Sequence, residues 1–259
     1  MTKTILITGA TDGIGLLTAK KLAAAGHAVL LHGRGEAKLA AAAEEVGTVA
    51  GTYAADLSDL AAVEGLAEAV RADHPRLDVL INNAGVLKAP ATVLANGLDL
   101  RFVVNAFAPY LLTRRLLPTM PRDGRVVNLS SAAQAKVDLK AMEGGRALGD
   151  MDAYSQSKLA LTIWTRELAA TLPEGPAIIA VNPGSLLASK MVKEGFGVAG
   201  SDLSIGADIL CEAALGDRFA DASGAYFDND ADRFSDPHRA ALDPAHAADV
   251  MRIVDRHAP

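Results

Sequence analysis

Tyr154 stands four positions before Lys158, at the start of the amphipathic pattern Ala153–Leu168. On a helix, residues at this spacing share a face, with Cβ atoms roughly 5–6 Å apart. An ammonium that close to a phenol stabilises the phenolate, so the pair could take up and release a proton. Half-ionising a tyrosine at neutral pH, from its ordinary pKa of about 10, requires roughly 4 kcal/mol. One lysine in water would not supply that free energy, whereas a dry site with a second cation could. An ordinary solvated helix pair is the alternative, because the motif fixes only two positions.

The segment Thr8–Gly15, TGATDGIG, could cradle a phosphate. Its glycines fall at Gly9, Gly13 and Gly15, between a short apolar run and a helix-like segment. Glycine permits a tight turn and close approach of the backbone to a pyrophosphate, which then lies at the positive N-terminus of the helix. The G-x-x-x-G-x-G spacing differs from the standard G-x-G-x-x-G, and a plain turn is the alternative. Its position between a first strand and a helix favours a dinucleotide.

The end of the second apolar run bears on which dinucleotide binds. An NAD site usually has a carboxylate there for the ribose 2′-hydroxyl, but this chain has His32, Gly33 and Arg34. An arginine can pair with a 2′-phosphate, so the pattern favours NADP(H) over NAD(H), with a solvated arginine as the alternative. Asp12 in the glycine turn adds an unfavourable negative charge. Asp56, after the third apolar run, could accept a bond from the adenine amine or could only cap the following helix.

Short apolar runs alternate with helix-like segments along the chain. The predicted strands are Thr4–Ile7, Ala28–Leu31, Thr48–Ala54, Leu77–Ile81, Gly124–Leu129, Ala177–Val181 and Gly224–Phe227. The predicted helices include Glu36–Val46, a segment that Ser58 can cap, Leu98–Leu117 ended by Pro118, and a last helix from the cap Asp243 and Pro244 to about Arg256. This alternation indicates parallel βαβ units. We therefore expect an α/β fold, one doubly wound (Rossmann) domain over residues 1–259, with a mostly parallel central sheet of about seven strands and helices on both faces.

Composition argues against several classes of function. The formal net charge is −6 and there is no run of lysines or arginines, so neither nucleic acid nor an anionic membrane is an expected partner. Cys211 is the single cysteine, which excludes a disulfide framework and fits a reducing compartment. The histidines show no metal-ligand spacing, so no metal is expected. The apolar run Ile5–Ile7 is too short for a signal-peptide core and no run is long enough to span a bilayer, so we expect a soluble cytoplasmic protein.

The strand-end motifs occur in a characteristic order. They are TGATDGIG, NNAG at Asn82–Gly85, Asn105, Ser131, Tyr154 with Lys158, and NPG at Asn182–Gly184. In this order they resemble the classical short-chain dehydrogenase/reductase family, strongly over about Thr2–Ser189 and weakly in the tail. YSQSKLALTIWTREL, RVVNLSS and RFVVNAFAPYLLT, with the 23-residue separation of Ser131 and Tyr154, look like the retinol-dehydrogenase-like branch. That branch acts on lipophilic aldehydes, ketones and alcohols, often with NADP.

The resemblance implies a catalytic set of Asn105, Ser131, Tyr154 and Lys158. Tyr154 would be the general acid/base that protonates a carbonyl oxygen or deprotonates an alcohol. Lys158 would lower the pKa of Tyr154 and bind the nicotinamide ribose, and the positive nicotinamide ring would be the second cation. Ser131 would hydrogen-bond the substrate oxygen, with a strand-terminal turn as the alternative. Asn105 lies in the middle of a helix, where asparagine has poor propensity; it would hold a water that connects Lys158 to solvent.

The resemblance also implies a cofactor site along the strand ends. The expected cofactor-binding residues are Gly9, Thr11, Asp12, Gly13, Ile14, Gly15, Arg34, Asp56, Leu57, Asn83, Ala84, Gly85, Tyr154, Lys158, Pro183, Gly184, Leu186 and Ser189. Asn83–Gly85 would line the adenosine ribose, although turn chemistry alone also explains these residues. Pro183 and Gly184 would border the nicotinamide. A following hydroxyl would bind its carboxamide, and Ser189 is the candidate, one position later than the threonine usual in the family.

The predicted function is therefore that of an NADP-dependent oxidoreductase that moves hydride between nicotinamide and a small carbonyl or alcohol substrate, expected to be lipophilic. A non-catalytic NADP sensor is the alternative, although such a protein would be expected to have lost Tyr154 or Lys158. A sugar-nucleotide epimerase fits less well, because its glycine turn is normally spaced differently and the chain lacks an extra C-terminal substrate domain. Two irregular stretches, Ala132–Asp152 and Ser185–Ser204, follow predicted strand ends and would define the substrate pocket.

Assembly is a further expectation from the resemblance. The family commonly pairs the helix of Tyr154 with the Leu98–Leu117 helix across a dimer, so a homodimer or homotetramer is expected. Trp164, Leu161 and Leu168 lie on the helix behind Tyr154 and could pack either in the core or at such an interface.

Overall fold

The computed structural model describes residues 1–188 and 200–259. Within these residues the strands form one eight-stranded sheet in the order β3-β2-β1-β4-β5-β6-β7-β8. The strands are β1 (Thr4–Ile7), β2 (Ala28–Gly33), β3 (Gly51–Ala54), β4 (Val79–Asn82), β5 (Arg125–Leu129), β6 (Ala177–Asn182), β7 (Tyr226–Asp228) and β8 (Arg233–Ser235). Neighbours from β3 to β7 are parallel, and β8 is antiparallel to β7. The predicted doubly wound α/β fold is confirmed, with β8 as a short strand that the sequence analysis missed.

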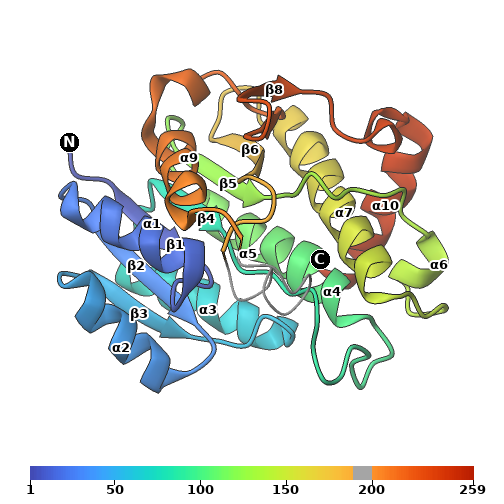
Figure 1. Ribbon diagram of the computed structural model, residues 1–259, viewed down its shortest axis with the longest axis horizontal. Helices are drawn as coiled ribbons and strands as arrows, with labels where there is room; N and C mark the ends of the chain where they lie inside the picture. The colour runs from blue at the N-terminus through green and yellow to red at the C-terminus, as the bar shows by residue number, and fades with distance from the viewer. Residues whose placement is uncertain (189–199) are drawn as a thin grey trace.

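Side chains alternate between the two faces of the sheet, and helices cover both faces (Figure 1). On β1, Ile5 and Ile7 pack on one face and Leu6 packs on the other. The Ile5 face is covered by α1 (Gly13–Ala24), α2 (Glu36–Val46) and α9 (Leu203–Leu215), and the Leu6 face by α3 (Leu60–Asp73), α5 (Ala108–Leu116) and α7 (Asp150–Ala170). Because both faces are buried, the strands are nearly continuous apolar runs, which made them recognisable in the sequence.

The helix predicted over Leu98–Leu117 contains a π-helical turn. Asp99 caps α4 (Leu100–Phe102) by accepting a bond from the backbone N–H of Arg101. The π-helical turn η1 (Val103–Phe107) follows and leads directly into α5. A short 3-10 turn, η2 (Leu117–Thr119), then ends the helical segment. Asn105 therefore lies in the π-helical turn, a feature often found at functional sites.

The cap of α3 differs from the prediction. Asp59, and not Ser58, is the N-cap, and its carboxylate accepts a bond from the N–H of Ala61. A carboxylate next to the helix is the better acceptor for these N–H groups, and it also interacts favourably with the helix dipole. Ser58 instead donates its hydroxyl to Asp56.

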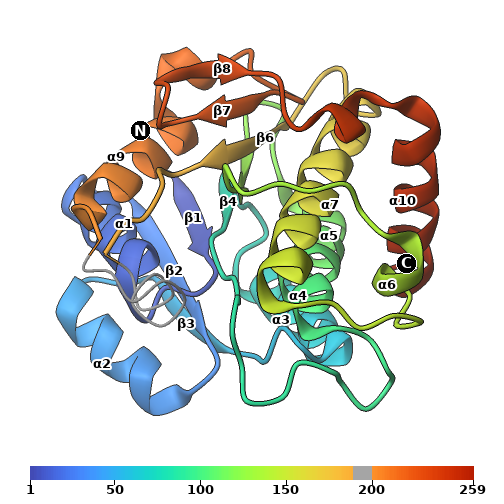
Figure 2. The same ribbon diagram turned by 45° about the vertical axis from the view of Figure 1, so that its right-hand side comes forward.

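The C-terminal helix α10 (Pro244–His257) begins as predicted, with Asp243 accepting bonds from two N–H groups of the first turn. It packs against α7 and the short helix α6 (Leu139–Met142) (Figure 2). The 3-10 turns η3 (Asp217–Phe219) and η4 (Arg239–Leu242) connect the tail elements.

Trp164 is fully buried in the cluster that includes Val250 and Val254 of α10. Trp164 is thus a core residue within the chain.

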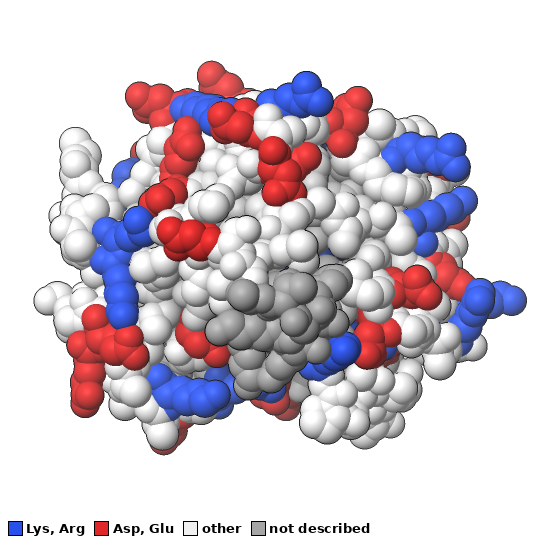
Figure 3. Space-filling model, viewed as in Figure 1, with Lys and Arg blue, Asp and Glu red and all other residues white. Residues whose placement is uncertain are grey.

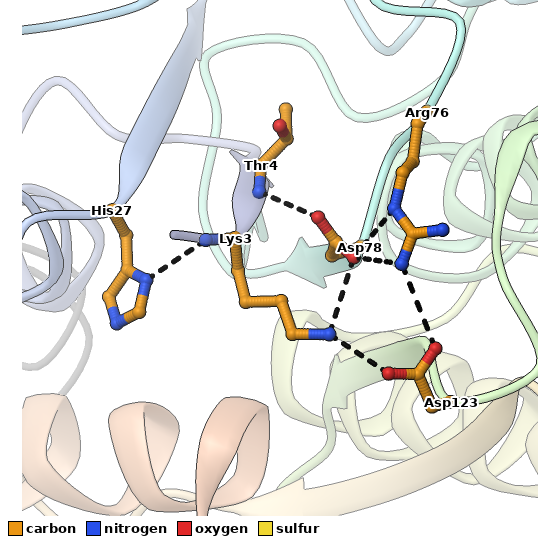
Figure 4. Close-up of polar contacts among 6 residues, drawn as sticks. All are labelled: Lys3, Thr4, His27, Arg76, Asp78 and Asp123. Atoms are coloured by element: carbon orange, nitrogen blue, oxygen red, sulfur yellow. Dashed lines mark hydrogen bonds and ion pairs between the residues drawn. The ribbon is translucent and has the colours of Figure 1, made fainter. Parts of the chain in front are cut away.

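Asp78 connects the amino ends of β1 and β4, opposite the strand ends that carry the motifs (Figure 4). Its Oδ2 accepts a bond from the N–H of Thr4 at 2.9 Å. Its Oδ1 accepts from Arg76 Nη2 at 2.9 Å and lies 3.4 Å from Lys3 Nζ. Burial acts to raise the pKa of Asp78, but these bonds outweigh it and keep the pKa below its ordinary value. The buried carboxylate therefore stabilises the central pair of strands.

Charged side chains of both signs are interspersed on the face seen in Figure 3, chiefly around its rim. Among the helices of residues 1–188 and 200–259, none combines the length and the apolar character needed to cross a membrane.

Candidate active site

The candidate site lies along the carboxyl ends of four adjacent strands, β1, β4, β5 and β6. The glycine turn follows β1, the NNAG motif begins at the end of β4, Ser131 follows β5 and Pro183 follows β6. This edge is where ligands of open α/β sheets bind. The fold thus brings together the motifs that the sequence separates.

The glycine turn leaves the N-terminus of α1 open to an anion. Gly9 and Gly13 have φ angles of 65° and 55°, which L side chains rarely adopt. A Cβ on Gly15 would lie 2.4 Å from Asn83 Nδ2, whereas one on Gly13 would meet nothing within 4 Å. Asp12, the N-cap of α1, makes no side-chain capping bond. The N–H groups of the first turn are therefore available, and the phosphates of a dinucleotide fit this turn.

Asn83 connects this turn to β4. Its Nδ2 donates to the carbonyls of Thr8 at 2.8 Å and Gly9 at 3.0 Å. The Thr8 hydroxyl accepts a bond from the N–H of Ala84 at 3.1 Å. These bonds give Asn83 and Ala84 a structural role in shaping the turn. The expected contacts of Asn83, Ala84 and the exposed Gly85 with the adenosine ribose stay predictions.

The side chain of His32 supports the turn from β2. Its ring is almost fully buried, Nδ1 accepts a bond from the N–H of Gly9 at 3.3 Å, and Nε2 lies 3.1 Å from the carbonyl of Ala55. This arrangement requires the neutral ring with its proton on Nε2. Burial lowers the pKa of His32 to about 4, which keeps the ring neutral. No motif in the sequence indicated a role for this histidine at the site.

The predicted adenosine end contains Arg34, Asp56 and Leu57. Arg34 is exposed and has no hydrogen bond or ion pair with any residue in the described part of the chain, so its guanidinium can pair with an anion.

Asp56 Oδ1 accepts bonds from the N–H and hydroxyl of Ser58 at 2.9 and 2.8 Å. The alternative that Asp56 caps α3 is therefore wrong, and its contact with adenine stays a prediction. The Leu57 side chain is buried in the core. Thr11 and Ile14, also predicted to bind the cofactor, are partly exposed in the glycine turn and the first turn of α1.

The structure brings together Tyr154, Lys158 and Ser131. The Ser131 side chain lies close enough to the Tyr154 phenol to act on its pKa, and Lys158 Nζ lies 5.6 Å from the centroid of the tyrosine ring. Lys158 is buried and donates to the carbonyl of Leu129 at 2.6 Å. Burial lowers the pKa of Lys158 to about 8. Burial also raises the pKa of Tyr154, while the nearby Ser131 side chain acts in the opposite direction.

The net pKa of Tyr154 lies above its ordinary value. Lys158 alone therefore does not make the phenol acidic, as expected from the free energy that its ionisation at neutral pH requires. A second positive charge near the phenol would favour the phenolate, and the expectation that the nicotinamide ring supplies it stays a prediction.

Asn105 is fully buried and joins α7 to the loop after β4. Its Oδ1 accepts from the N–H of Val86 at 2.8 Å, and its Nδ2 donates to the Val86 carbonyl and the Ser157 hydroxyl, both at 2.9 Å. Ser157 donates in turn to the carbonyl of Tyr154 at 2.7 Å. Asn105 thus contacts the helix of Tyr154 directly, and its expected water contact with Lys158 stays a prediction.

The loop after β6 is anchored by the turn between β7 and β8. Asn182 Nδ2 donates to carboxylates of Asp228 and Asp230, each at 2.9 Å. Ser185 donates its N–H and its hydroxyl to Asp230. Asn229 Nδ2 donates to the carbonyl of Pro183 at 2.9 Å. The weakly matching tail therefore fixes the loop predicted to border the nicotinamide.

Gly184 and Leu186 occupy unusual backbone conformations in this loop. Their φ angles are 119° and 51°, and the Leu186 side chain is exposed. A left-handed leucine is uncommon, and such positions cluster at ligand sites. Ser189, the predicted carboxamide ligand, lies outside the described residues, and a contact of Leu186 with the cofactor stays a prediction.

A model of the family described as short chain dehydrogenase matches residues 3–196. The chain belongs to the short-chain dehydrogenase family. Bos taurus retinol dehydrogenase 12 is 37% identical over 204 residues, covering 75% of this chain and 64% of that protein. Homo sapiens retinol dehydrogenase 13 is 30% identical over 286 residues, covering 99% of this chain and 86% of that protein. Membership of the family places the chain among oxidoreductases that act on CH–OH and C=O groups. The similarity to retinol dehydrogenases agrees with the retinol-dehydrogenase-like branch predicted from the sequence.

Solved structures share the short-chain dehydrogenase fold with this chain. An uncharacterized protein from Mycobacterium paratuberculosis has a TM-score of 0.83 and 29% identity, covering 99% of this chain and 93% of that one. The landomycin C-6 ketoreductase LanV with bound NADP and rabelomycin has a TM-score of 0.69 and 31% identity, covering 88% and 94%. The 3-ketoacyl-(acyl-carrier-protein) reductase from Brucella melitensis complexed with NADH has a TM-score of 0.70 and 25% identity, covering 87% and 96%.

Sequence reasoning missed several side chains that shape this short-chain dehydrogenase site. They are His32 behind the glycine turn, Gln134 and Tyr226 beside Ser131, and Asp230 behind the loop after β6. None of them belongs to a local motif. Only the position of His32, at the end of an apolar run, gave a signal that could have been followed.

Proposed function

We propose that the chain is an NADP(H)-dependent oxidoreductase that interconverts a carbonyl group and an alcohol in a lipophilic small molecule, with Tyr154 as general acid/base. The observation that carries this proposal is the grouping of Tyr154, Ser131 and the buried Lys158, with Lys158 Nζ 5.6 Å from the centroid of the tyrosine ring. These groups lie on the same sheet edge as the open glycine turn. We also propose that residues 1–259 act as one NAD(P)-binding domain.

The protein's own groups would handle the proton and position the reacting oxygen. Ser131 would donate to the substrate oxygen, and Tyr154 would give a proton to that oxygen in reduction or take one from it in oxidation. An ammonium has three N–H donors, and one of those on Lys158 is used by Leu129 O. The other two have no hydrogen-bond partner in residues 1–188 and 200–259, so they are available to a ribose hydroxyl or a water. A bound nicotinamide would supply or accept the hydride, and its oxidised ring would supply the second positive charge.

Arg34 supports NADP(H) over NAD(H). It is an exposed cation beyond the end of β2, where an NAD site usually has a carboxylate. The NADP complex of LanV agrees with this preference, whereas the NADH complex of the Brucella melitensis reductase shows that the same fold also serves the other cofactor.

A lipophilic substrate is supported by apolar side chains near the loop after β6. Leu186 and Ile205 are both large hydrophobic residues with 47% of their surface exposed. A Cβ placed on Gly184 would lie 3.8 Å from Ile205, so the α9 residue borders this loop. The relatives named retinol dehydrogenases agree with an apolar substrate class.

The test is NADPH oxidation over a panel of aldehydes and ketones of graded size, repeated with NADH, for the unchanged protein and for Tyr154→Phe. Phenylalanine keeps the ring and removes only the hydroxyl. We expect NADPH affinity to persist and turnover to fall by roughly 10²–10⁴-fold, the usual contribution of general acid–base catalysis. Persistent turnover in the variant would refute the role of Tyr154. NADPH binding with no turnover on any member of the panel would favour the non-catalytic sensor.

The predicted homodimer or homotetramer and the cytoplasmic location stay predictions. The structure limits how a dimer could form, because Tyr110 of α5 donates its hydroxyl to Asp255 of α10 and Phe107 stacks on His257. The α5 and α7 surface is therefore at least partly covered by the chain's own C-terminal helix.

A further inference from the structure

The backbone of Ser131 leaves the sheet just where its hydroxyl is needed. The N–H of Ser130 still donates to the carbonyl of Val181 at 2.8 Å, which continues the pairing of β5 with β6. The next residue, Ser131, has no such backbone partner from the neighbouring strand. Its backbone carbonyl instead accepts hydrogen bonds from side chains.

Two side chains donate to the carbonyl oxygen of Ser131. The Tyr226 hydroxyl lies 3.1 Å from this oxygen, and Gln134 Nε2 lies 3.0 Å from it. A carbonyl has two lone pairs, so these donors satisfy it completely. Gln134 is itself fixed, because its Oε1 accepts a bond from the N–H of His238 at 3.1 Å. The strand-end serine is thus connected to β7 and to the segment that leads into α10.

The sheet register explains how Tyr226 reaches Ser131 from two strands away. Phe227 packs in the cluster on the α1 side of the sheet, so its neighbour Tyr226 projects toward the α7 side. Its partner on the intervening strand is Ala180. The small methyl side chain of Ala180 leaves room for the phenol to extend across β6 toward the end of β5.

The same loop fixes the orientation of the Ser131 hydroxyl. Ser131 Oγ accepts a bond from the N–H of Ala133 at 3.0 Å, and the same side chain lies near the Tyr154 phenol and acts to lower its pKa. A shift of the Ser131 backbone would therefore change both contacts. Misplacement of a catalytic group by about 1 Å can cost roughly 10²-fold in rate.

We propose that Tyr226, assisted by Gln134, is a positioning residue that keeps the Ser131 hydroxyl in contact with Tyr154. The proposal rests on the proposed function, since it assigns Ser131 its place in the reaction. Tyr226 is 5% exposed, so a purely structural role in the core is the competing explanation. The two explanations differ in whether loss of the hydroxyl alone changes the proton chemistry of Tyr154.

The chain has four tyrosines, which allows a matched test. Tyr226→Phe removes the bond to the Ser131 carbonyl, while Tyr53→Phe and Tyr110→Phe remove phenol bonds to the carboxylates of Asp73 and Asp255. We expect kcat to fall about tenfold in Tyr226→Phe, with unchanged NADPH affinity, and to remain unchanged in both controls. The limb of the pH profile that reports Tyr154 should move to higher pH, because the bond from Ser131 favours the phenolate. Equal kcat and pH profiles in Tyr226→Phe and Tyr53→Phe would overturn the proposal.

A second measurement does not depend on turnover. With ¹³Cζ-labelled tyrosine, the Tyr154 resonance is assigned by its loss in Tyr154→Phe and then titrated in each of the other variants. We expect its chemical shift and pKa to change in Tyr226→Phe and in Gln134→Ala, and not in the controls. Gln134 is only partly buried, so its variant tests the idea even if Tyr226→Phe folds poorly. An unchanged Tyr154 resonance in both variants would refute the positioning role, whereas absent turnover in the unchanged protein would refute only the proposed function.

Discussion

The backbone N–H of Gly9 donates to Nδ1 of His32 across 3.3 Å, and this bond attaches the glycine turn to the end of β2. Because the same ring contacts the carbonyl of Ala55, one buried side chain connects the ends of β1, β2 and β3. The pyrophosphate turn and the segment expected to bind adenosine are thus fixed relative to each other. Replacing His32 should therefore affect the binding of any dinucleotide.

The first prediction concerns His32→Phe. We expect Kd to rise about tenfold for both NADPH and NADH, equivalent to ~1.4 kcal/mol, because the turn loses its acceptor without any change in charge near the 2′ position. Unfolding should require about 1–3 kcal/mol less, since two backbone groups lose a buried partner. Titration calorimetry and urea unfolding measure these effects. His27→Phe is the control: His27 Nδ1 accepts from the N–H of Lys3 at 3.2 Å at the other end of the sheet, so its loss should not change cofactor affinity.

The pKa of His32 also gives this variant a pH dependence. The folded pKa of about 4 lies below the ordinary value of 6.5, so between these pH values the unfolded chain binds a proton that the folded protein does not. The free energy of unfolding therefore falls as the pH drops from 6.5 toward 4. The advantage of the unchanged protein over His32→Phe should shrink in that window. A constant difference between the two unfolding curves would contradict a neutral buried ring.

The second prediction concerns Arg34→Ala. Arg34 is exposed and has no partner in the described residues, so its loss should leave folding unchanged. Hydrogen bonds to charged groups contribute about 1.5–3 kcal/mol, so Kd for NADPH should rise roughly 10–100-fold while Kd for NADH stays nearly constant. Arg71→Ala, which removes an exposed arginine from α3, is the control and should change neither constant. Equal losses for the two cofactors would identify Arg34 as an ordinary surface residue.

The sequence predicted the features that depend on residues close together along the chain. Apolar runs buried on both faces identified seven strands, and the four-residue spacing of Tyr154 and Lys158 predicted a shared helix face. The strand β8 was missed because Arg233–Ser235 contains a single apolar residue and pairs only with β7. The π-helical turn around Asn105 was missed as well, since its apolar pattern does not distinguish it from an α-helix.

Contacts between distant segments could not be predicted in this way. Tyr226 and Ser131 are 95 positions apart, and their bond depends on the strand order and on the small Ala180 between them. The elevated pKa of Tyr154 likewise results from burial in the folded protein, which opposes the effect expected from the spacing alone.

The last prediction concerns Asp78→Asn, at the end of the sheet opposite the site. The Asp78 side chain is 6% exposed and bonds Thr4, Arg76 and Lys3, whereas Asp123 contacts the same lysine and arginine with 69% exposure (Figure 4). We expect Asp78→Asn to lower the free energy of unfolding by about 1–3 kcal/mol, because the buried carboxylate loses charge-assisted bonds. Asp123→Asn, the control, should change it by less than about 1 kcal/mol, since exposed pairs contribute little.

The carboxylate of Asp78 has a folded pKa below its ordinary value, so its stabilisation is complete above the unfolded pKa and is lost as the pH falls through the folded pKa. Urea unfolding of both variants at pH 7 and pH 3 measures this. The difference between the unchanged protein and Asp78→Asn should be smaller at pH 3, because the carboxylate is then partly protonated in the unfolded chain. NADPH affinity should be the same in both variants at pH 7, because the cluster lies at the amino ends of β1 and β4. A difference that grows toward pH 3 would show that the Asp78 carboxylate does not stabilise the strands through its charge.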